Sequence, residues 1–184
     1  MPYLVRIILQ FLLVTSLGLT ITLRASAQDC KLRVSLLTAS PGEELYSTFG
    51  HSALRIIDST NNRDIVFNYG TFNFDEPNFY LKFIRGKLKY FVSLDEFNSF
   101  AYSLQLENRS ITEQVLNLTC EEKKKLKEYL QWNLLPANMY YKYDFTFDNC
   151  TTRLRDLVEI TANDSVEFRS ILTEPSTFRD AIHE

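Results

Sequence analysis

The chain alternates short apolar stretches with polar turns, and this pattern predicts a set of β-strands. Apolar residues recur at every second position or in short runs, which is typical of strands that bury one or both faces. The expected strands cover residues 32–37, 49–58, 64–70, 87–92, 109–118 and 141–147. The polar stretch from Ser59 to Arg63 predicts a hairpin between the second and third of these strands.

Other segments carry signals for helices. A short helix is expected over residues 78–85, where Gly86 would end it. Two capping boxes, Ser93–Glu96 and Thr119–Glu122, predict the starts of helices that reach to about residues 105 and 135. Strands and helices together predict an α+β fold in which helices pack against an antiparallel sheet.

The first 27 residues are organised like a secretory signal peptide. Arg6 precedes an apolar stretch from Ile7 to Leu23, and Ala25-Ser26-Ala27 is a small-residue cleavage motif. We expect cleavage after Ala27, which leaves a single exported domain over residues 28–184. An uncleaved single-span anchor is the alternative, because the apolar run is barely long enough to cross a bilayer.

The amino-acid composition limits the kinds of binding partner that we expect. With 45% hydrophobic residues in 184, the chain can form a globular domain with a real core. Its formal charge of −3 becomes −5 when Arg6 and Arg24 leave with the leader, so a nucleic-acid partner is not expected. The 14% aromatic content suits an apolar groove or a membrane-facing surface, although a β-rich core explains it equally well. Residues 78–92, which mix apolar side chains with four cations, are the candidate acyl groove, and ordinary packing is the alternative.

Cys150 is the candidate nucleophile. It follows Asp148 and Asn149, two good N-cap residues, and lies four residues before Leu154 on the apolar face of a helix expected to end near Thr161. The unpaired N–H groups and the positive end of the helix dipole there favour the thiolate. The alternative is a small buried residue that fills the helix start.

The cysteine count leaves this choice open. A disulfide between Cys30 and Cys120 would leave Cys150 free. A bridge from either of them to Cys150 would exclude the nucleophile and favour a non-catalytic binding domain. No metal site or cofactor is expected.

His51 is the candidate base, because the other histidine, His183, is the second-last residue. A cysteine and a histidine on separate elements meet the needs of thiol catalysis. If the hairpin turns about Asn61, His51 faces residues near 71, so Asn68 is the candidate orienting group. Arg55, on the same face as His51, could hold an anionic head group or simply point to water.

Two motifs, Gly-His51-Ser-Ala-Leu-Arg55 and Asp-Asn-Cys150-Thr-Thr-Arg153, resemble those of a bacterial exported family. It is the N-terminal periplasmic domain family of the Bacteroidetes lipoprotein N-acyltransferase, here called Lnb-like, and the likeness spans residues 30–184. The order of histidine before cysteine is similar to that of permuted papain-like enzymes of the NlpC/P60 group, including lecithin–retinol acyltransferase. The resemblance implies a permuted papain-like (NlpC/P60-type) fold with an antiparallel sheet and a helix that bears the cysteine.

The resemblance also implies a function. It assigns Cys150 and His51 as nucleophile and base of a periplasmic acyltransferase that moves an acyl chain from a phospholipid, through a thioester, to the N-terminal amine of a diacylglyceryl lipoprotein. Tyr69 and Arg153, within or beside the matching motifs, are expected to bind substrate together with Arg55. Contact with the membrane surface is expected, and a cell-wall cysteine peptidase or amidase of NlpC/P60 type is the alternative. Family members usually extend beyond this length, so the chain is expected to be a short member or a fragment.

Overall fold

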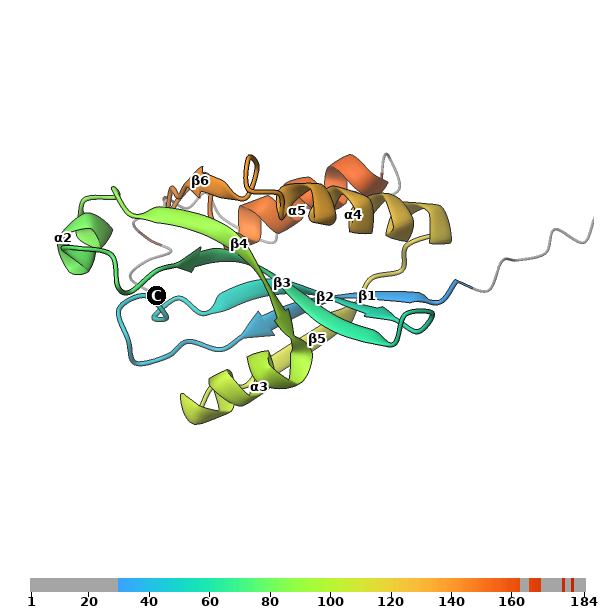
Figure 1. The fold of residues 1–184 in the computed structure, drawn as a ribbon, viewed down its shortest axis with the longest axis horizontal. Helices are drawn as coiled ribbons and strands as arrows, with labels where there is room; N and C mark the ends of the chain where they lie inside the picture. The colour runs from blue at the N-terminus through green and yellow to red at the C-terminus, as the bar shows by residue number, and fades with distance from the viewer. Residues whose placement is uncertain (1–29, 163–165, 170–176, 178–179, 181–184) are drawn as a thin grey trace, which may run out of the picture.

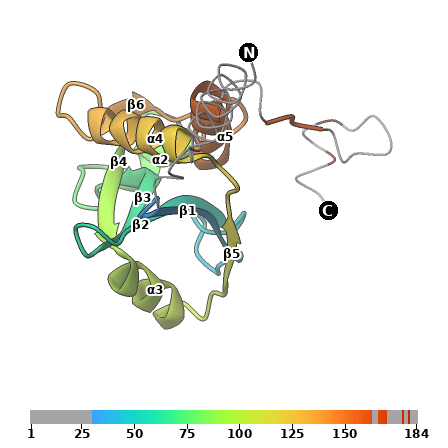
Figure 2. The same ribbon diagram turned by 90° about the vertical axis from the view of Figure 1, so that its right-hand side faces the viewer.

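The described part of the chain forms one twisted antiparallel sheet with helices on both faces (Figures 1 and 2). This computed structural model describes residues 30–162, 166–169, 177 and 180. The predicted signal peptide lies outside the described residues. The six strands, in the spatial order β5-β1-β2-β3-β4-β6, are β1 (Leu32–Ala39), β2 (His51–Asp58), β3 (Arg63–Phe72), β4 (Lys89–Glu96), β5 (Ile111–Val115) and β6 (Tyr140–Lys142).

Four helices complete the described fold: α2 (Phe79–Ile84), α3 (Phe97–Leu106), α4 (Cys120–Asn133) and α5 (Cys150–Ala162). Helices α4 and α5 lie over one face of the sheet, and α3 lies under the other (Figure 2). The α+β class and the antiparallel sheet are therefore as predicted, and α5 is the expected packed helix that bears the cysteine.

Both faces of the central strands are apolar, which explains why helices cover both. On the first face, Leu54 of β2 and Phe67 of β3 pack with buried leucines of α4 and α5. On the second face, Ala53 and Val66 pack with Phe100 of α3. Because successive strand residues point to opposite faces, this division fixes the direction of every side chain along β2.

The β2–β3 hairpin has almost the expected register. Leu54 pairs with Phe67, which is a shift of one residue from a turn centred on Asn61. The pairing of β3 with β4 is interrupted between Tyr69 and Thr71, where Gly70 has a φ of 90°. This positive φ favours glycine, and the irregularity lies where β3 runs past the start of β2.

One capping box is confirmed and the other is wrong. Thr119 accepts from the backbone N–H of Glu122, whose side chain accepts from the Thr119 N–H at 2.7 Å. At the second site, β4 continues through Glu96, the residue before α3, and no side chain caps that helix. Ser93 instead shares a hydrogen bond with the Thr71 hydroxyl on the neighbouring strand at 2.9 Å. Strand pairing therefore outweighs the capping-box motif at this site.

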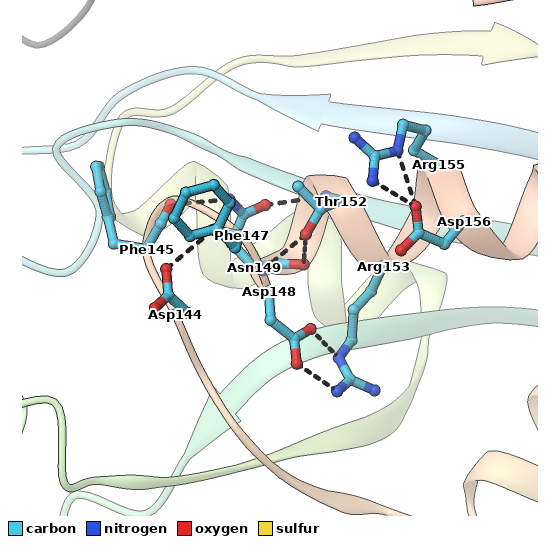
Figure 3. A network of polar contacts seen from close by, with 9 residues as sticks. All are labelled: Asp144, Phe145, Phe147, Asp148, Asn149, Thr152, Arg153, Arg155 and Asp156. Atoms are coloured by element: carbon cyan, nitrogen blue, oxygen red, sulfur yellow. Dashed lines mark hydrogen bonds and ion pairs between the residues drawn. The ribbon is translucent and has the colours of Figure 1, made fainter. Parts of the chain in front are cut away.

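The predicted aromatic strand over residues 141–147 is also mostly wrong, because β6 ends at Lys142. The Asp144 carboxylate accepts from the backbone N–H groups of Thr146 and Phe147, each at 2.9 Å (Figure 3). This side-chain turn competes with strand pairing and bends the chain. The alternation of aromatic residues therefore continues across a turn, and it does not mark one strand.

A disulfide joins Cys30 to Cys120 and ties the residues before β1 to the start of α4. Cys150 is free. Of the helices in the described residues, none is long and apolar enough to span a bilayer.

Candidate active site

The start of α5 is held by a compact set of hydrogen bonds centred on Asn149 (Figure 3). Its side-chain oxygen accepts from the Thr152 N–H at 2.9 Å, and its own N–H donates to the Thr152 hydroxyl at 2.8 Å. Its amide nitrogen also donates to the Phe145 carbonyl at 2.9 Å. Asn149 is therefore the N-cap, as predicted, and it fixes Cys150 in the first turn of the helix.

Arg153, one turn further along α5, braces the same loop. Its guanidinium forms two parallel bonds to Asp148, at 2.6 and 2.7 Å (Figure 3). It also lies 3.6 Å above the centre of the Tyr141 ring. A guanidinium that is bound to a carboxylate and stacked on a ring is held in place by contacts within the protein. The structure therefore places Arg153 as a support for the loop before Cys150, and it is not a lining residue of the pocket that holds the thiol.

His51, the first residue of β2, is bound to Asn68 of β3. Its Nε2 contacts the side-chain oxygen of Asn68. Because that oxygen can only accept, Nε2 must carry the proton, and Nδ1 of the neutral ring is left with a free lone pair. The structure thus brings together the predicted histidine and the predicted orienting residue.

Cys150 and His51 meet at the end of the sheet where β2 begins and β3 ends. By strand alternation His51 faces α3, whereas α5 lies on the opposite face, and both side chains border Gly70. A Cβ at Gly70 would lie 3.7 Å from Cβ of Cys150 and 3.9 Å from Cε1 of His51, which is ordinary contact, so the space alone does not require glycine. Its φ of 90° does favour glycine, and at this bend of β3 the imidazole and the thiol come within hydrogen-bonding reach.

The electrostatics favour an ionised thiol. Burial raises the pKa of Cys150, but hydrogen bonding to His51, the charge of its imidazole and the Ser52 backbone N–H outweigh burial and lower the pKa to about 7. About half of the thiol is therefore thiolate at neutral pH. A thiolate beside a base whose other nitrogen is held by an amide can attack an acyl carbon.

The thiol opens into a largely apolar pocket of about 380 Å³. Its apolar walls come mainly from three segments: Leu45 and Phe49 before β2, Phe83 and Ile84 of α2, and Phe145 before α5. Three tyrosines, Tyr46, Tyr90 and Tyr143, also line it. Part of the predicted groove segment, residues 78–92, is thus in the pocket wall. Within the described residues, no cluster of histidine, cysteine, aspartate and glutamate could hold a metal ion.

A family model described as the Lnb N-terminal periplasmic domain matches residues 22–184. The match covers all of the chain but its first 21 residues, including both sequence motifs. The chain belongs to this Lnb domain family. The match also identifies it as an exported, periplasmic domain. No curated protein and no solved structure matches the chain.

Two of the expected substrate-binding residues of this Lnb domain lie elsewhere. Arg55 binds Asp64 at 2.6 and 2.7 Å and Glu113 at 3.1 Å, and lies 3.3 Å above the Phe97 ring on the α3 face. Tyr69 is buried in the core between the sheet and α5. Neither lines the pocket of Cys150. Arg55 shares the α3 face with His51 but lies four residues further along β2, and Tyr69 is packed within the core.

Tyr143 is a site residue of the Lnb domain that the sequence did not single out. Its ring lies at the same glycine, 3.6 Å from the Cβ position of Gly70, and stacks on Tyr90 with 4.4 Å between ring centres. Burial and the negative charge of Cys150 raise the pKa of the Tyr143 hydroxyl, so it stays protonated and can donate. The aromatic alternation contained Tyr143 but gave no reason to separate it from its neighbours.

Proposed function

We propose that this domain is a thiol acyltransferase that takes an acyl chain from a phospholipid onto Cys150 and passes it to an amine. The observation that carries the proposal is the contact of His51 and Cys150 across Gly70, at the mouth of an apolar pocket. The lowered pKa of the thiol, about 7, supports it. The amine of a diacylglyceryl lipoprotein is the proposed acceptor, in keeping with the family.

In the first half-reaction, Nδ1 of His51 takes the thiol proton, and the sulfur attacks the ester carbonyl carbon. The backbone N–H of Cys150 and the Tyr143 hydroxyl are proposed to hold the developing oxyanion. Collapse breaks the ester C–O bond, and the imidazolium returns its proton to the departing glycerol oxygen. The products are an acyl thioester on Cys150 and a lysophospholipid.

In the second half-reaction, the acceptor amine attacks the thioester carbonyl carbon. The C–S bond breaks, sulfur leaves as thiolate and His51 takes the proton that the amine loses. The product is an amide, and the thiolate–imidazolium pair is restored by these steps. Asn68 acts in both halves by holding the ring so that Nδ1 faces the sulfur.

The nature of the pocket favours this reaction over peptide hydrolysis. Most of its wall is apolar, and apart from His51 and Cys150 its only hydrogen-bonding side chains among the described residues are three tyrosines, Tyr46, Tyr90 and Tyr143. An extended peptide needs such partners along its length, whereas an acyl chain needs only apolar contact. The free state of Cys150 also argues against a disulfide-bonded binding domain.

Product analysis tests the proposal. The protein is incubated with phospholipid and a synthetic diacylglyceryl-cysteine peptide, and the peptide mass is followed. We expect an added acyl group on the peptide amine with the wild type and none with Cys150→Ser. Release of free fatty acid with no acylated peptide would assign a hydrolase, and cleavage of a cell-wall peptide would assign the peptidase.

A further inference from the structure

A second pocket, of about 180 Å³, lies on the Asn68 side of His51. It shares His51, Gly70 and Tyr46 with the pocket of Cys150, but Asn68 and Arg109 line only this second pocket. The steps proposed above leave this pocket without a role. The imidazole therefore stands between the pocket of Cys150 and a second pocket that contains a guanidinium and an amide.

Arg109 is the unusual residue of this pocket. Its side chain is only 6% exposed. Nε donates to the Ser40 carbonyl at 2.8 Å and Nη1 to Glu107 at 3.0 Å, but the buried Nη2 has no hydrogen-bond partner in the described part of the chain. A buried guanidinium N–H without an acceptor is costly, and such an orphan in a native fold calls for a missing acceptor.

Two further donors line the same pocket. Burial and the negative charge of Glu107 raise the pKa of the Tyr46 hydroxyl, so it remains protonated. The side-chain oxygen of Asn68 is occupied by His51, while its amide nitrogen makes no hydrogen bond to any described residue. Glu107, which binds Nη1 of Arg109, is not among the lining residues, and neither is any other aspartate or glutamate. The guanidinium with its free Nη2, the phenol and the amide are complementary to an anion with several oxygens.

We propose that this pocket binds the phosphate oxygens of the phospholipid acyl donor, with Arg109 as the principal contact and Tyr46 and Asn68 as further donors. The inference rests on the proposed function, because it assigns the two pockets beside His51 to two parts of one substrate, the phosphate and the acyl ester. In a phospholipid the glycerol unit separates the phosphate from the acyl ester. A phosphate held by Arg109 therefore leaves the ester on the Cys150 side of His51, so phosphate binding orients the ester for attack.

Binding of sn-glycerol 3-phosphate at constant ionic strength tests the subsite without any acyl transfer. Calorimetric titration should show saturable binding to the wild type and none of glycerol. Arg109→Met should weaken binding by at least about tenfold, as loss of a charge-assisted bond implies, and Tyr46→Phe by a few-fold. Arg33→Met is the matched control, since Arg33 pairs with Glu113 at the opposite end of β1, and it should leave binding unchanged.

Acylation supplies an independent readout. The rate on a short-chain phosphatidylglycerol, divided by the rate on p-nitrophenyl butyrate, should fall at least about tenfold in Arg109→Met and stay constant in Arg33→Met. If Arg109→Met does not fold, the few-fold loss in Tyr46→Phe decides by both measurements.

The possible outcomes separate this inference from the proposed function. Glycerol phosphate that fails to bind, or that binds equally well to folded Arg109→Met, overturns the subsite. Inorganic phosphate that binds as tightly as glycerol phosphate, with no change in the ratio of acylation rates, overturns the lipid assignment. Arg109-dependent binding without acylation of Cys150 by any ester upholds the phosphate subsite and overturns the acyltransferase.

Discussion

At the scale of single residues, the site depends on one imidazole with two unlike neighbours. Asn68 holds Nε2 of His51, and the thiol of Cys150 lies on the other side of the ring. This arrangement lowers the pKa of the thiol against the effect of burial. The thiol should therefore lose its acidity when the ring is removed.

The first prediction is that His51→Ala raises the pKa of Cys150. Without the imidazole, burial raises the pKa of the thiol and only the Ser52 N–H and the Thr151 hydroxyl still lower it, so the pKa should rise from about 7 to about 8.5, the value of a free thiol. At pH 7 the thiolate fraction then falls from about one half to about 3%. The rate of alkylation by iodoacetamide, measured against pH, should show the midpoint move upward. An unchanged midpoint would mean that the ring does not act on the sulfur.

Sequence reasoning could reach these residues only in part. His51 and Cys150 stood out because few residues of their kinds are present, and Asn68 followed from the hairpin register. Arg55 and Tyr69 were assigned to substrate although strand alternation turns them to the α3 face and into the core. The role of Gly70 depends on a positive φ and a break in strand pairing, which no pattern in the chain reports.

At the scale of elements, the first turn of α5 determines where the sulfur lies. Asn149 caps this turn, and Thr119 caps α4 in a similar way. Only the Asn149 cap is next to the thiol. Variants at the two caps therefore distinguish an effect on the stability of the fold from an effect on the position of the sulfur.

The second prediction compares these two caps. Asn149→Ala and Thr119→Ala should each lower the free energy of unfolding by about 1 kcal/mol, because each exposes an unpaired N–H at a helix start. Only Asn149→Ala should also slow acylation of Cys150 by an activated ester. Denaturant unfolding and ester kinetics on both variants provide the comparison. Equal slowing in both would show that the rate follows stability and not the position of the turn.

The elements also show which local signals can be trusted. Threonine at 119 and serine at 93 begin similar motifs, and each is followed by the predicted helix. Only Thr119 caps its helix, because Ser93 is paired across the sheet with Thr71 and α3 begins later, at Phe97. The aromatic alternation before α5 failed where Asp144 could bind two backbone N–H groups. In the first case the deciding partner, Thr71, lies outside the motif. In the second, Asp144 lies within the run, but a pattern of aromatic residues takes no account of it.

At the scale of the whole molecule, large apolar side chains gather at the mouth of the thiol pocket. Phe49 is 59% exposed and Ile84 is 74% exposed, and they come from segments on separate sides of the pocket. Exposed apolar residues around a mouth are unfavourable in water but suit the interface of a bilayer. We expect this rim to dock on the membrane that supplies the acyl donor.

The third prediction tests docking on vesicles of phosphatidylethanolamine and phosphatidylglycerol. The double variant Phe49→Ser with Ile84→Ser should bind several-fold more weakly in a sedimentation assay, since two exposed apolar anchors are lost. Leu106→Ser is the control, because Leu106 is 67% exposed at the end of α3 and does not line the pocket. Equal loss in the control would contradict the assignment of the rim.

The most direct test of the central claim is the intact mass of the protein after incubation with phospholipid in the absence of an acceptor. We expect the wild type to gain the mass of one acyl group less one hydrogen, removable by hydroxylamine, and Cys150→Ser to gain nothing. An alkylatable wild-type thiol that never carries an acyl chain, or an equal gain in Cys150→Ser, would contradict it.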